Sequence, residues 1–360
     1  MKKQKLLFVV EAMGGGVFTY IVDLANELVH FYDMYIAYAV RPQTPSDYRE
    51  QFDRRIHLIE VKNFTRAVHP KKDLKAFFEI KKIARQISPD IIHLHSSKAG
   101  TLGRWAFCGR HTALFYTPHG YSFLMADCGW KKRLLFKVIE IVCAKRNCTV
   151  ISCSEGEHME TLKLTRKATY VNNGINIQKL QELIHASVPV KKEKFTVFTL
   201  GRICAQKNPA LFNQIAEAMP EVQFIWIGDG ELRKELKSSN IEITGWVKRE
   251  KALQYSLGAD VFLLVSLWEG LPMSLLEAMY MKKVCVVSDV VGNHDVIHTN
   301  QNGYVCRNLS DFINAIREVM KNGQDILAER AYKDVIREYN TTVMAEKYYK
   351  IYRKEFAKIK

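Results

Sequence analysis

Short apolar runs alternate along the chain with stretches in which apolar residues recur every three to four positions. The first run covers residues 6–10. The stretch after it has one apolar helical face, formed by Phe18, Ile21, Val22, Ala25, Leu28 and Val29. Further runs that predict strands lie at 34–40, 56–61, 91–95, 114–117, 150–154, 168–172, 196–200, 222–227, 241–244, 261–265, 284–288 and 304–306. Strands that alternate with helical stretches predict an α/β protein with doubly wound parallel sheets.

Two domains are expected, because 360 residues exceed what one hydrophobic core usually supports. Residues 172–194 interrupt the alternation with a short helical stretch, Pro189 and a run of charged residues at 191–194. We expect the linker in this segment, which divides the chain into an N-terminal domain 1–185 and a C-terminal domain 186–340.

Positive charge is concentrated in the first half of the chain. The net charge is +15, and residues 1–190 carry 28 Lys and Arg against 17 Asp and Glu. Such a surface suits nucleic acid, anionic lipid or a phosphorylated substrate. No helix-turn-helix, zinc-finger or RNA-binding motif accompanies the charge, so no nucleic-acid partner is expected.

The sequence predicts a protein of the reducing cytoplasm. No apolar run approaches the roughly 18 to 20 residues of a membrane-spanning helix. The basic start precedes an apolar run, as in a signal peptide, but this run ends at Glu11 and is short enough to be a first strand. The eight cysteines include no CxxC pair and lie mostly in apolar contexts, so they are expected to be structural.

Two carboxylates follow a predicted strand in the second half. The strand 261–265 is followed by Ser266-Leu-Trp-Glu-Gly-Leu-Pro-Met-Ser-Leu-Leu-Glu-Ala-Met279, in which Pro272 suits a first helical turn. Glu269 then lies in the loop and Glu277 in the helix, so both can line one cleft and bind sugar hydroxyls. N–H groups at the start of the helix suit an anionic or polyhydroxylated ligand, and they belong to Gly270, Leu271 and Met273.

Two cations follow an earlier strand of the same half. The segment Gly201-Arg-Ile-Cys-Ala-Gln-Lys207 comes directly after the strand 196–200, so Arg202 and Lys207 lie five residues apart beside a glycine. Two fixed cations suit a diphosphate. The nearest approach to an acidic metal motif is Gly228-Asp-Gly-Glu231, which has a single Asp, and no metal ion is expected.

The two segments together resemble the signature of glycosyltransferase family 4, whose members are retaining enzymes. The signature residues are Gly201, Arg202, Lys207, Glu269 and Glu277. The loop Gly14-Gly-Gly16 and the segment Thr117-Pro-His-Gly120 also resemble that family. The resemblance implies a GT-B fold, in which two Rossmann-like domains face each other across a cleft and a terminal helix, here 341–360, packs back on the first domain.

The resemblance also implies roles for individual residues. The residues that it assigns to catalysis are Glu269, His119, Arg202 and Lys207. Those that it assigns to donor binding are Gly15, Gly16, Arg202, Lys207, Val247, Gly270, Leu271, Met273 and Glu277. Arg202 and Lys207 would neutralise the leaving diphosphate in place of a metal ion. Glu277 would bind ribose hydroxyls, and Glu269 would bind hydroxyls of the donor sugar.

Several residues of the first half keep more than one interpretation. The glycine loop lacks the third glycine of a dinucleotide fingerprint, yet Arg41 after the strand 34–40 would suit an NADP-dependent enzyme. His119 is either a buried histidine satisfied by the backbone or an imidazole that contacts the transferred sugar. His93 and His95 share one face of a strand and are expected to pack or to contact the acceptor. Ser97 and Lys98, just beyond the end of that strand, are expected on the acceptor side.

Trp130 precedes a cluster of cations and a largely apolar helical stretch. It is followed by Lys131, Lys132 and Arg133. One interpretation is a core helix with a solvated first turn. The other is a contact with an anionic membrane surface, made by Trp130 and these three cations.

The expected protein is therefore a retaining, metal-independent glycosyltransferase without a cofactor. It would transfer a hexosyl or N-acetylhexosaminyl unit from a nucleotide sugar, expected to be a UDP-sugar, to a saccharide acceptor linked to a lipid diphosphate. The resemblance to enzymes of capsule, exopolysaccharide and O-antigen synthesis places it at the inner face of a bacterial membrane as a peripheral protein. A sugar-nucleotide epimerase or hydrolase of the same fold and a non-enzymatic nucleotide-sugar-binding scaffold remain alternatives.

Overall fold

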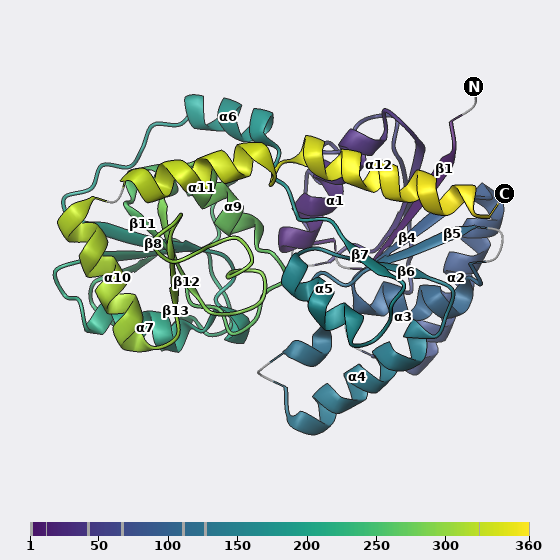
Figure 1. The fold of residues 1–360 in the computed structure, drawn as a ribbon, viewed down its shortest axis with the longest axis horizontal. Helices are drawn as coiled ribbons and strands as arrows, with labels where there is room; N and C mark the ends of the chain where they lie inside the picture. Colours follow the sequence, from purple (N-terminus) through teal and green to yellow (C-terminus); the bar gives the residue numbers. More distant parts are fainter. Residues whose placement is uncertain are drawn as a thin grey trace. The chain divides into compact units, whose positions relative to one another are not determined.

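A computed structural model describes residues 3–11, 13–41, 44–65, 68–109, 112–125, 128–323 and 325–359 (Figure 1). Its contacts divide the chain into two compact units. The first comprises Met1–Leu124, Cys128–Asn173 and Thr341–Lys360, and the second is built on Gly174–Asn340. The division thus falls after Asn173 and not after residue 185 as predicted, because α6 (Ile177–His185) contacts α8 (Arg249–Gly258) of the second unit.

The first unit contains a seven-stranded parallel sheet in the order β3-β2-β1-β4-β5-β6-β7. Its strands are β1 (Lys5–Val10), β2 (Asp33–Tyr38), β3 (His57–Glu60), β4 (Ile91–His95), β5 (Ala113–Thr117), β6 (Thr149–Ser152) and β7 (Ala168–Tyr170). Val10 pairs with His95, and His95 pairs with Thr117, so β1, β4 and β5 end in line. The loops after these three strands therefore lie side by side at one edge of the sheet.

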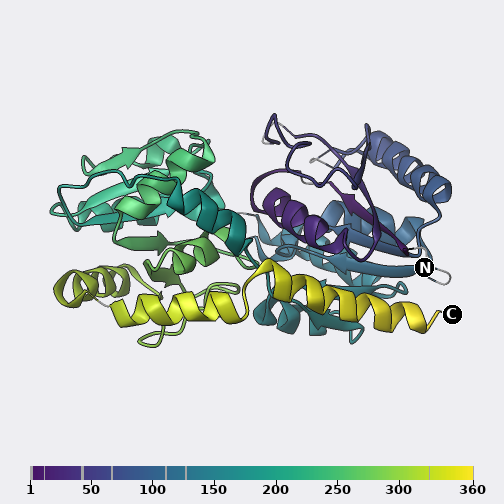
Figure 2. The same ribbon diagram turned by 90° about the horizontal axis from the view of Figure 1, so that it is seen from above.

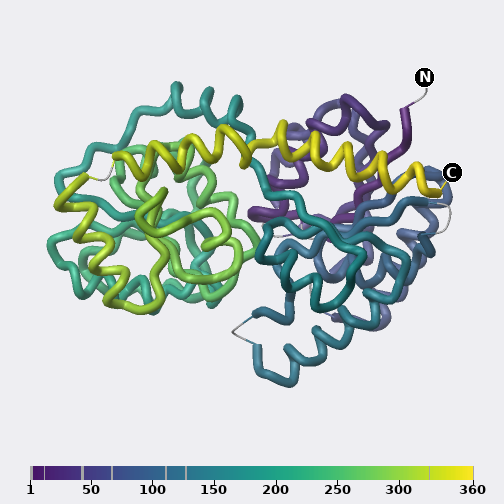
Figure 3. The backbone as a smooth tube through the Cα atoms, in the orientation of Figure 1, coloured from purple at the N-terminus to yellow at the C-terminus, as the bar shows by residue number. Residues whose placement is uncertain are grey.

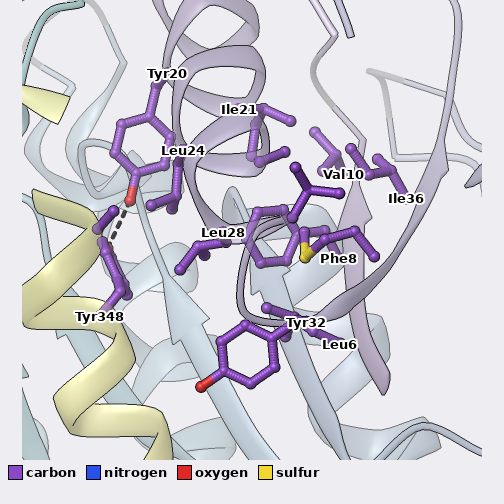
Figure 4. Packing of buried hydrophobic residues seen from close by; sticks show 14 of the residues in the cluster. Leu6, Phe8, Val10, Tyr20, Ile21, Leu24, Leu28, Tyr32, Ile36 and Tyr348 are labelled. Atoms are coloured by element: carbon purple, nitrogen blue, oxygen red, sulfur yellow. Dashed lines mark hydrogen bonds between the residues drawn. The ribbon is translucent and has the colours of Figure 1, made fainter. Parts of the chain in front are cut away.

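Helices cover both faces of this sheet. They are α1 (Gly15–Leu28), α2 (Pro70–Ile87), α3 (Ser97–Ala106), the 3-10 turn η1 (Ser122–Leu124), α4 (Trp130–Ala144), α5 (Glu155–Leu162) and α12 (Thr341–Ala357). Successive side chains of a strand point to opposite faces. Phe8 therefore packs with α1 and α12 (Figure 4), and Leu7 with the buried residues of α2 and α3. Seen from above, α2 and α12 lie on opposite sides of the unit (Figure 2).

The first and last helices of the chain pack together in the first unit. α12 packs beside α1, although more than 300 residues separate them in the sequence (Figure 3). Tyr348 and Tyr352 of α12 are fully buried in the same core cluster as Phe8 and Tyr20. The hydroxyl of Tyr20 donates to that of Tyr348 over 2.6 Å.

The second unit contains a six-stranded parallel sheet in the order β10-β9-β8-β11-β12-β13. Its strands are β8 (Thr196–Leu200), β9 (Gln223–Ile227), β10 (Ile241–Ile243), β11 (Val261–Leu264), β12 (Val284–Ser288) and β13 (Tyr304–Cys306). Its other elements are η2 (Ala205–Lys207), α7 (Pro209–Glu217), η3 (Arg233–Glu235), α9 (Met273–Tyr280), α10 (Leu309–Asn322) and α11 (Asp325–Arg337). The predicted α/β class with two doubly wound parallel sheets is confirmed.

Some predicted boundaries differ from the structure. α1 begins at Gly15 and not near Phe18, so Gly15 and Gly16 belong to its first turn. Trp130 is the first residue of α4 and does not precede it. Pro272 is the N-cap of α9, one position before its first turn. None of the helices in the described residues has the length and apolar character needed to cross a bilayer.

Candidate active site

The signature residues of the second unit gather where the strand order reverses. β8 lies between β9 and β11, and the chain crosses from one side of β8 to the other between β10 and β11. In sheets of this kind, ligands bind at such a reversal, beyond the carboxyl ends of the strands. Gly201–Lys207 follows β8, and Ser266–Glu269 follows β11.

The glycine after β8 allows the backbone to turn sharply. Gly201 has a φ of +147°, a value that side chains rarely permit. Its carbonyl oxygen would lie 2.2 Å from a Cβ added at Gly228, so the loops after β8 and β9 are in direct backbone contact. The N–H of Gly201 donates to the carbonyl oxygen of Ile227 over 3.0 Å. A side chain at Gly228 would push these loops apart, and one at Gly201 would be disfavoured by the φ of that residue.

Lys207 and Glu269 form a nearly buried ion pair. Lys207 Nζ lies 2.7 Å from Glu269 Oε1, and the side chains are 15% and 7% exposed. Gln206 Nε2 donates to the Trp268 carbonyl over 2.9 Å and to Glu269 Oε2 over 3.3 Å. The Leu267 N–H donates to the Gln206 carbonyl. These bonds connect the loop after β8 to the loop after β11. Lys207 and Glu269, which were predicted from separate segments, therefore lie in direct contact.

Arg202 does not join this pair. Its Nε lies 2.9 Å from Glu231 Oε2, and both side chains are substantially exposed. Exposed ion pairs contribute little to stability, because water solvates the separated charges well. Arg202 can therefore exchange Glu231 for an anionic ligand at small cost.

Glu277 is held by an arginine that the sequence did not single out. Arg249, in the first turn of α8, forms two bonds to its carboxylate, of 2.6 and 3.1 Å. Glu277 is buried, whereas the Arg249 side chain is 42% exposed. Arg249 stands in the charged run Lys248-Arg-Glu-Lys251, which has the composition of a solvated helix start. In the sequence, Arg249 is marked only by its positive charge a few residues after a predicted strand. Such cations are too common to identify a binding site.

The start of α9 is largely enclosed by the protein. Leu271 and Met273 are buried, and Gly270 is partly buried. Gly292 has a φ of +86° and lies close to the backbone of Gly270. A Cβ added to Gly292 would be 2.3 Å from the Gly270 carbonyl oxygen. Val247 is partly buried and lies two residues after Gly245, which pairs with Gly228 as an isolated bridge.

In the first unit, Gly15 and Gly16 are exposed at the start of α1. Gly15 has a φ of +57°, which favours glycine there. Arg41, which an NADP site would use, forms an ion pair with Glu11, and its Nε donates to the Glu11 carbonyl over 3.1 Å. The guanidinium that the NADP interpretation required is therefore engaged within the protein.

His119 stands on a loop that a buried carboxylate holds. Glu157 accepts hydrogen bonds from the N–H of Gly120 over 2.6 Å and from that of Cys153 over 2.8 Å. His119 itself has a φ of +56° and is partly buried. Its side chain contacts His95, with Nε2 3.1 Å from His95 Nδ1. Burial lowers the pKa of His119 to about 3, so the ring is neutral at physiological pH.

Ser97 and Lys98 lie at the start of α3. Ser97 Oγ lies 3.0 Å from Ser122 Oγ. Lys98 Nζ lies 2.7 Å from Asp73 and 3.2 Å from Thr65 Oγ1, with its side chain largely buried. Lys98 therefore ties α3 to α2, a contact that the sequence did not predict.

α4 exposes an apolar face along its whole length. Six of its large apolar side chains are between 41% and 71% exposed: Trp130, Leu134, Leu135, Val138, Ile141 and Val142. The opposite side is anchored by buried Glu140, which pairs with Arg104 over 2.7 Å. Lys131, Lys132 and Arg133 are exposed in the first turn. The interpretation of this segment as a core helix is therefore wrong.

No group of three or more His, Cys, Asp or Glu side chains in the described ranges is arranged to hold a metal ion.

Comparison with solved structures identifies the class of fold. The chain superposes on sucrose-phosphate synthase from Thermosynechococcus elongatus with a TM-score of 0.83 at 16% identity, covering 99% of this chain and 100% of the other. It superposes on Anabaena HepE in complex with UDP and glucose with a TM-score of 0.76 at 15% identity, covering 98% and 100%. The fold is that of the GT-B glycosyltransferases.

Comparison with family models is more specific. Residues 14–179 match the model "Glycosyltransferase Family 4", and residues 194–322 match "Glycosyl transferases group 1". The chain therefore belongs to glycosyltransferase family 4, as its signature residues predicted.

Two similar relatives act on lipid-linked sugars. One is the UDP-Gal:alpha-D-GlcNAc-diphosphoundecaprenol alpha-1,3-galactosyltransferase of Escherichia coli, 27% identical over 84% of this chain and 85% of its own length. The other is the N,N'-diacetylbacillosaminyl-diphospho-undecaprenol alpha-1,3-N-acetylgalactosaminyltransferase of Campylobacter jejuni, 26% identical over 81% and 84%.

Proposed function

We propose that this glycosyltransferase moves a hexosyl or N-acetylhexosaminyl unit from a UDP-sugar to a saccharide linked to a lipid diphosphate, with retention and without a metal ion. The observation that carries the proposal is the Lys207–Glu269 pair at the strand-order reversal of the second unit. The names of the two relatives support a lipid-diphosphate acceptor, and the HepE complex supports UDP.

The charges of the second unit suit a nucleotide diphosphate and a sugar. Lys207 would place one cation against the diphosphate, and Arg202 would release Glu231 to supply a second. Each would stabilise the charge that develops on the leaving group, which is the task of a divalent ion in metal-dependent enzymes. Glu269 would accept hydrogen bonds from the donor sugar, and Glu277, oriented by Arg249, from the ribose.

The proposed step needs no side-chain base. The bond between the anomeric carbon and the diphosphate oxygen breaks as the acceptor hydroxyl approaches from the same face. The acceptor oxygen forms the new bond to the anomeric carbon, and its proton passes to the oxygen of the leaving diphosphate. UDP is released with that proton, so the atoms and charges balance.

Membrane contact through α4 is the second part of the proposal. An amphipathic helix of this kind lies in the interface, with its apolar residues roughly 5 to 10 Å deep in the headgroup region. Trp130, Leu134 and Val138 would enter the bilayer, and Lys131 and Lys132 would meet anionic headgroups. Each cation near an anionic leaflet contributes about 1 kcal/mol. A lipid-linked acceptor would then be reached without extraction from the membrane.

A transfer assay with purified protein tests the catalytic part. UDP-sugars are first screened for thermal stabilisation, since a ligand at 100 times its Kd adds about 2.7 kcal/mol. The best donor is then incubated with a diphosphoundecaprenol-linked sugar, with and without excess EDTA. We expect transfer in both. Loss of activity in EDTA with recovery on adding Mn²⁺ would refute metal independence, and turnover of the donor equally fast without acceptor would favour the hydrolase or epimerase alternative.

A further inference from the structure

A cluster of buried histidine and tyrosine side chains lies beneath His119 in the first unit. His93 and His95 come from β4, Tyr20 from α1, and Tyr348 and Tyr352 from α12. All five are at most 1% exposed. Figure 4 shows the Tyr20 and Tyr348 hydroxyls directed at each other across the core. Because the cluster is closed to water, each ring nitrogen must be satisfied by a neighbour or left without a partner.

The hydrogen-bond partners of His93 determine where its proton lies. Thr117 Oγ1 donates to the Ile151 carbonyl over 2.8 Å, so this hydroxyl can only accept from His93 Nε2, which lies 2.8 Å away. On the other side of the ring, Nδ1 lies 2.5 Å from the Tyr352 hydroxyl, which donates to it. His93 is therefore neutral and carries its proton on Nε2. Burial also lowers its pKa.

His95 has one partner and one nitrogen without any. Its Nδ1 lies 3.1 Å from His119 Nε2, and its Nε2 is buried with no hydrogen-bond partner in the described part of the chain. One proton lies between the two rings. If His119 donated it, His95 would carry its own proton on Nε2 as an N–H without an acceptor. If His95 donates it, Nε2 is a lone pair without a donor. Buried N–H groups without an acceptor are the rarer and costlier of the two.

We infer that His95 is a positioning residue that donates its Nδ1–H to His119 Nε2 and so fixes the His119 proton on Nδ1. His119 then presents a neutral N–H donor, whose acceptor is an oxygen of the sugar or of the diphosphate. This assignment of the acceptor depends on the proposed function, whereas the position of the proton does not. Glu157 and the left-handed backbone of His119 hold the loop while His95 sets the ring.

Histidine ring nitrogens labelled with ¹⁵N test the position of the proton directly. Long-range ¹H–¹⁵N spectra of the full chain distinguish protonated from unprotonated ring nitrogens, and single substitutions assign His95 and His119. We expect both rings to be protonated on Nδ1, and His93 on Nε2. A His119 protonated on Nε2, or present as an equal mixture of the two forms, would overturn the inference. The measurement needs neither substrate nor activity.

Two variants test the effect on the reaction. His95→Phe keeps a ring and removes the donor, so His119 should exchange between its two neutral forms. We expect kcat to fall by about 10- to 100-fold, with UDP affinity within about twofold of the wild type, because the ring is misplaced and the nucleotide site is intact. Tyr352→Phe is the matched control, since it removes a hydroxyl from the same cluster but leaves the His95–His119 pair. It should keep the His119 tautomer and the wild-type kcat.

Failure of the inference is distinguishable from failure of the proposed function. A wild-type kcat in His95→Phe, or an equal loss of kcat in both variants, would refute a specific role of His95 in positioning. If no UDP-sugar were a substrate but the spectra showed the expected protons, the position of the proton would stand and the proposed donor would be wrong.

Discussion

Replacing Lys207 by Met tests the central charge pair of the second unit. The substitution keeps the length of the side chain and removes its charge, which leaves the carboxylate of Glu269 nearly buried and unpaired. Removing one partner of a buried pair typically costs 3 to 5 kcal/mol, because the remaining charge keeps its desolvation penalty. Lys207 is slightly exposed, so we expect about 3 kcal/mol, or a fall in the melting temperature of about 6 to 12 °C for a unit of this size.

A second substitution separates stability from binding. Glu269→Gln removes the unpaired charge, so the Lys207→Met, Glu269→Gln double variant should recover most of the lost stability. It should not recover affinity for UDP, because the cation is still absent. A charged hydrogen bond contributes about 1.5 to 3 kcal/mol, so both variants should bind UDP roughly 10- to 100-fold more weakly.

Thermal denaturation and titration calorimetry with UDP measure the two effects. A double variant no more stable than Lys207→Met would show that the buried carboxylate was not the source of the loss. Unchanged UDP affinity in Lys207→Met would show that Lys207 does not face the diphosphate. Lys163→Met, at an exposed pair with Glu160 in the first unit, is a control in which neither property should change appreciably.

Three further predictions concern other parts of the protein. Glu269→Gln should lower turnover more than UDP affinity, whereas Glu277→Ala should weaken UDP itself; equal losses of UDP affinity would contradict the proposed roles. The protein should sediment with anionic but not with neutral vesicles, and high salt should weaken this binding only partly. The double substitution Leu134→Ser, Leu135→Ser should abolish the vesicle binding that remains at high salt. A protein that stays in the supernatant with both kinds of vesicle at every salt concentration would favour a soluble acceptor. His119 has a pKa lowered to about 3, so below about pH 6.5 it binds a proton in the unfolded chain but not in the folded one. The free energy of unfolding should therefore fall as the pH drops from 6.5 toward 3. Urea denaturation at several pH values should show a smaller fall in the His119→Gln variant.

The sequence was sufficient for the fold because the signals of the strands are local. The apolar run 284–288 coincides with β12, since a strand buried on both faces leaves little room for polar residues. The start of α1 was misplaced because glycines weaken the helical signal of the first turn.

Long-range partners were not predictable in the same way. The pairing of Glu277 with Arg249 and that of Lys98 with Asp73 join residues 28 and 25 positions apart, and no local pattern distinguishes these cations from their neighbours. The sequence could not decide between the two interpretations of α4 for a related reason, because its apolar residues look alike in sequence whether they face a core or solvent. Which side of the helix is covered depends on the buried Arg104–Glu140 pair.

The position of α12 has a consequence for how the protein is made. The core of the first unit includes Met344, Tyr348 and Tyr352, which a ribosome synthesises after every residue of the second unit. Domains usually fold in the order in which they emerge, the N-terminal one first. Here all residues of the second unit are synthesised before α12, the helix that covers part of the core of the first unit. A nascent chain that is released before residue 341 would therefore lose the tyrosines under His119, and the damage from a C-terminal truncation would appear in the N-terminal half.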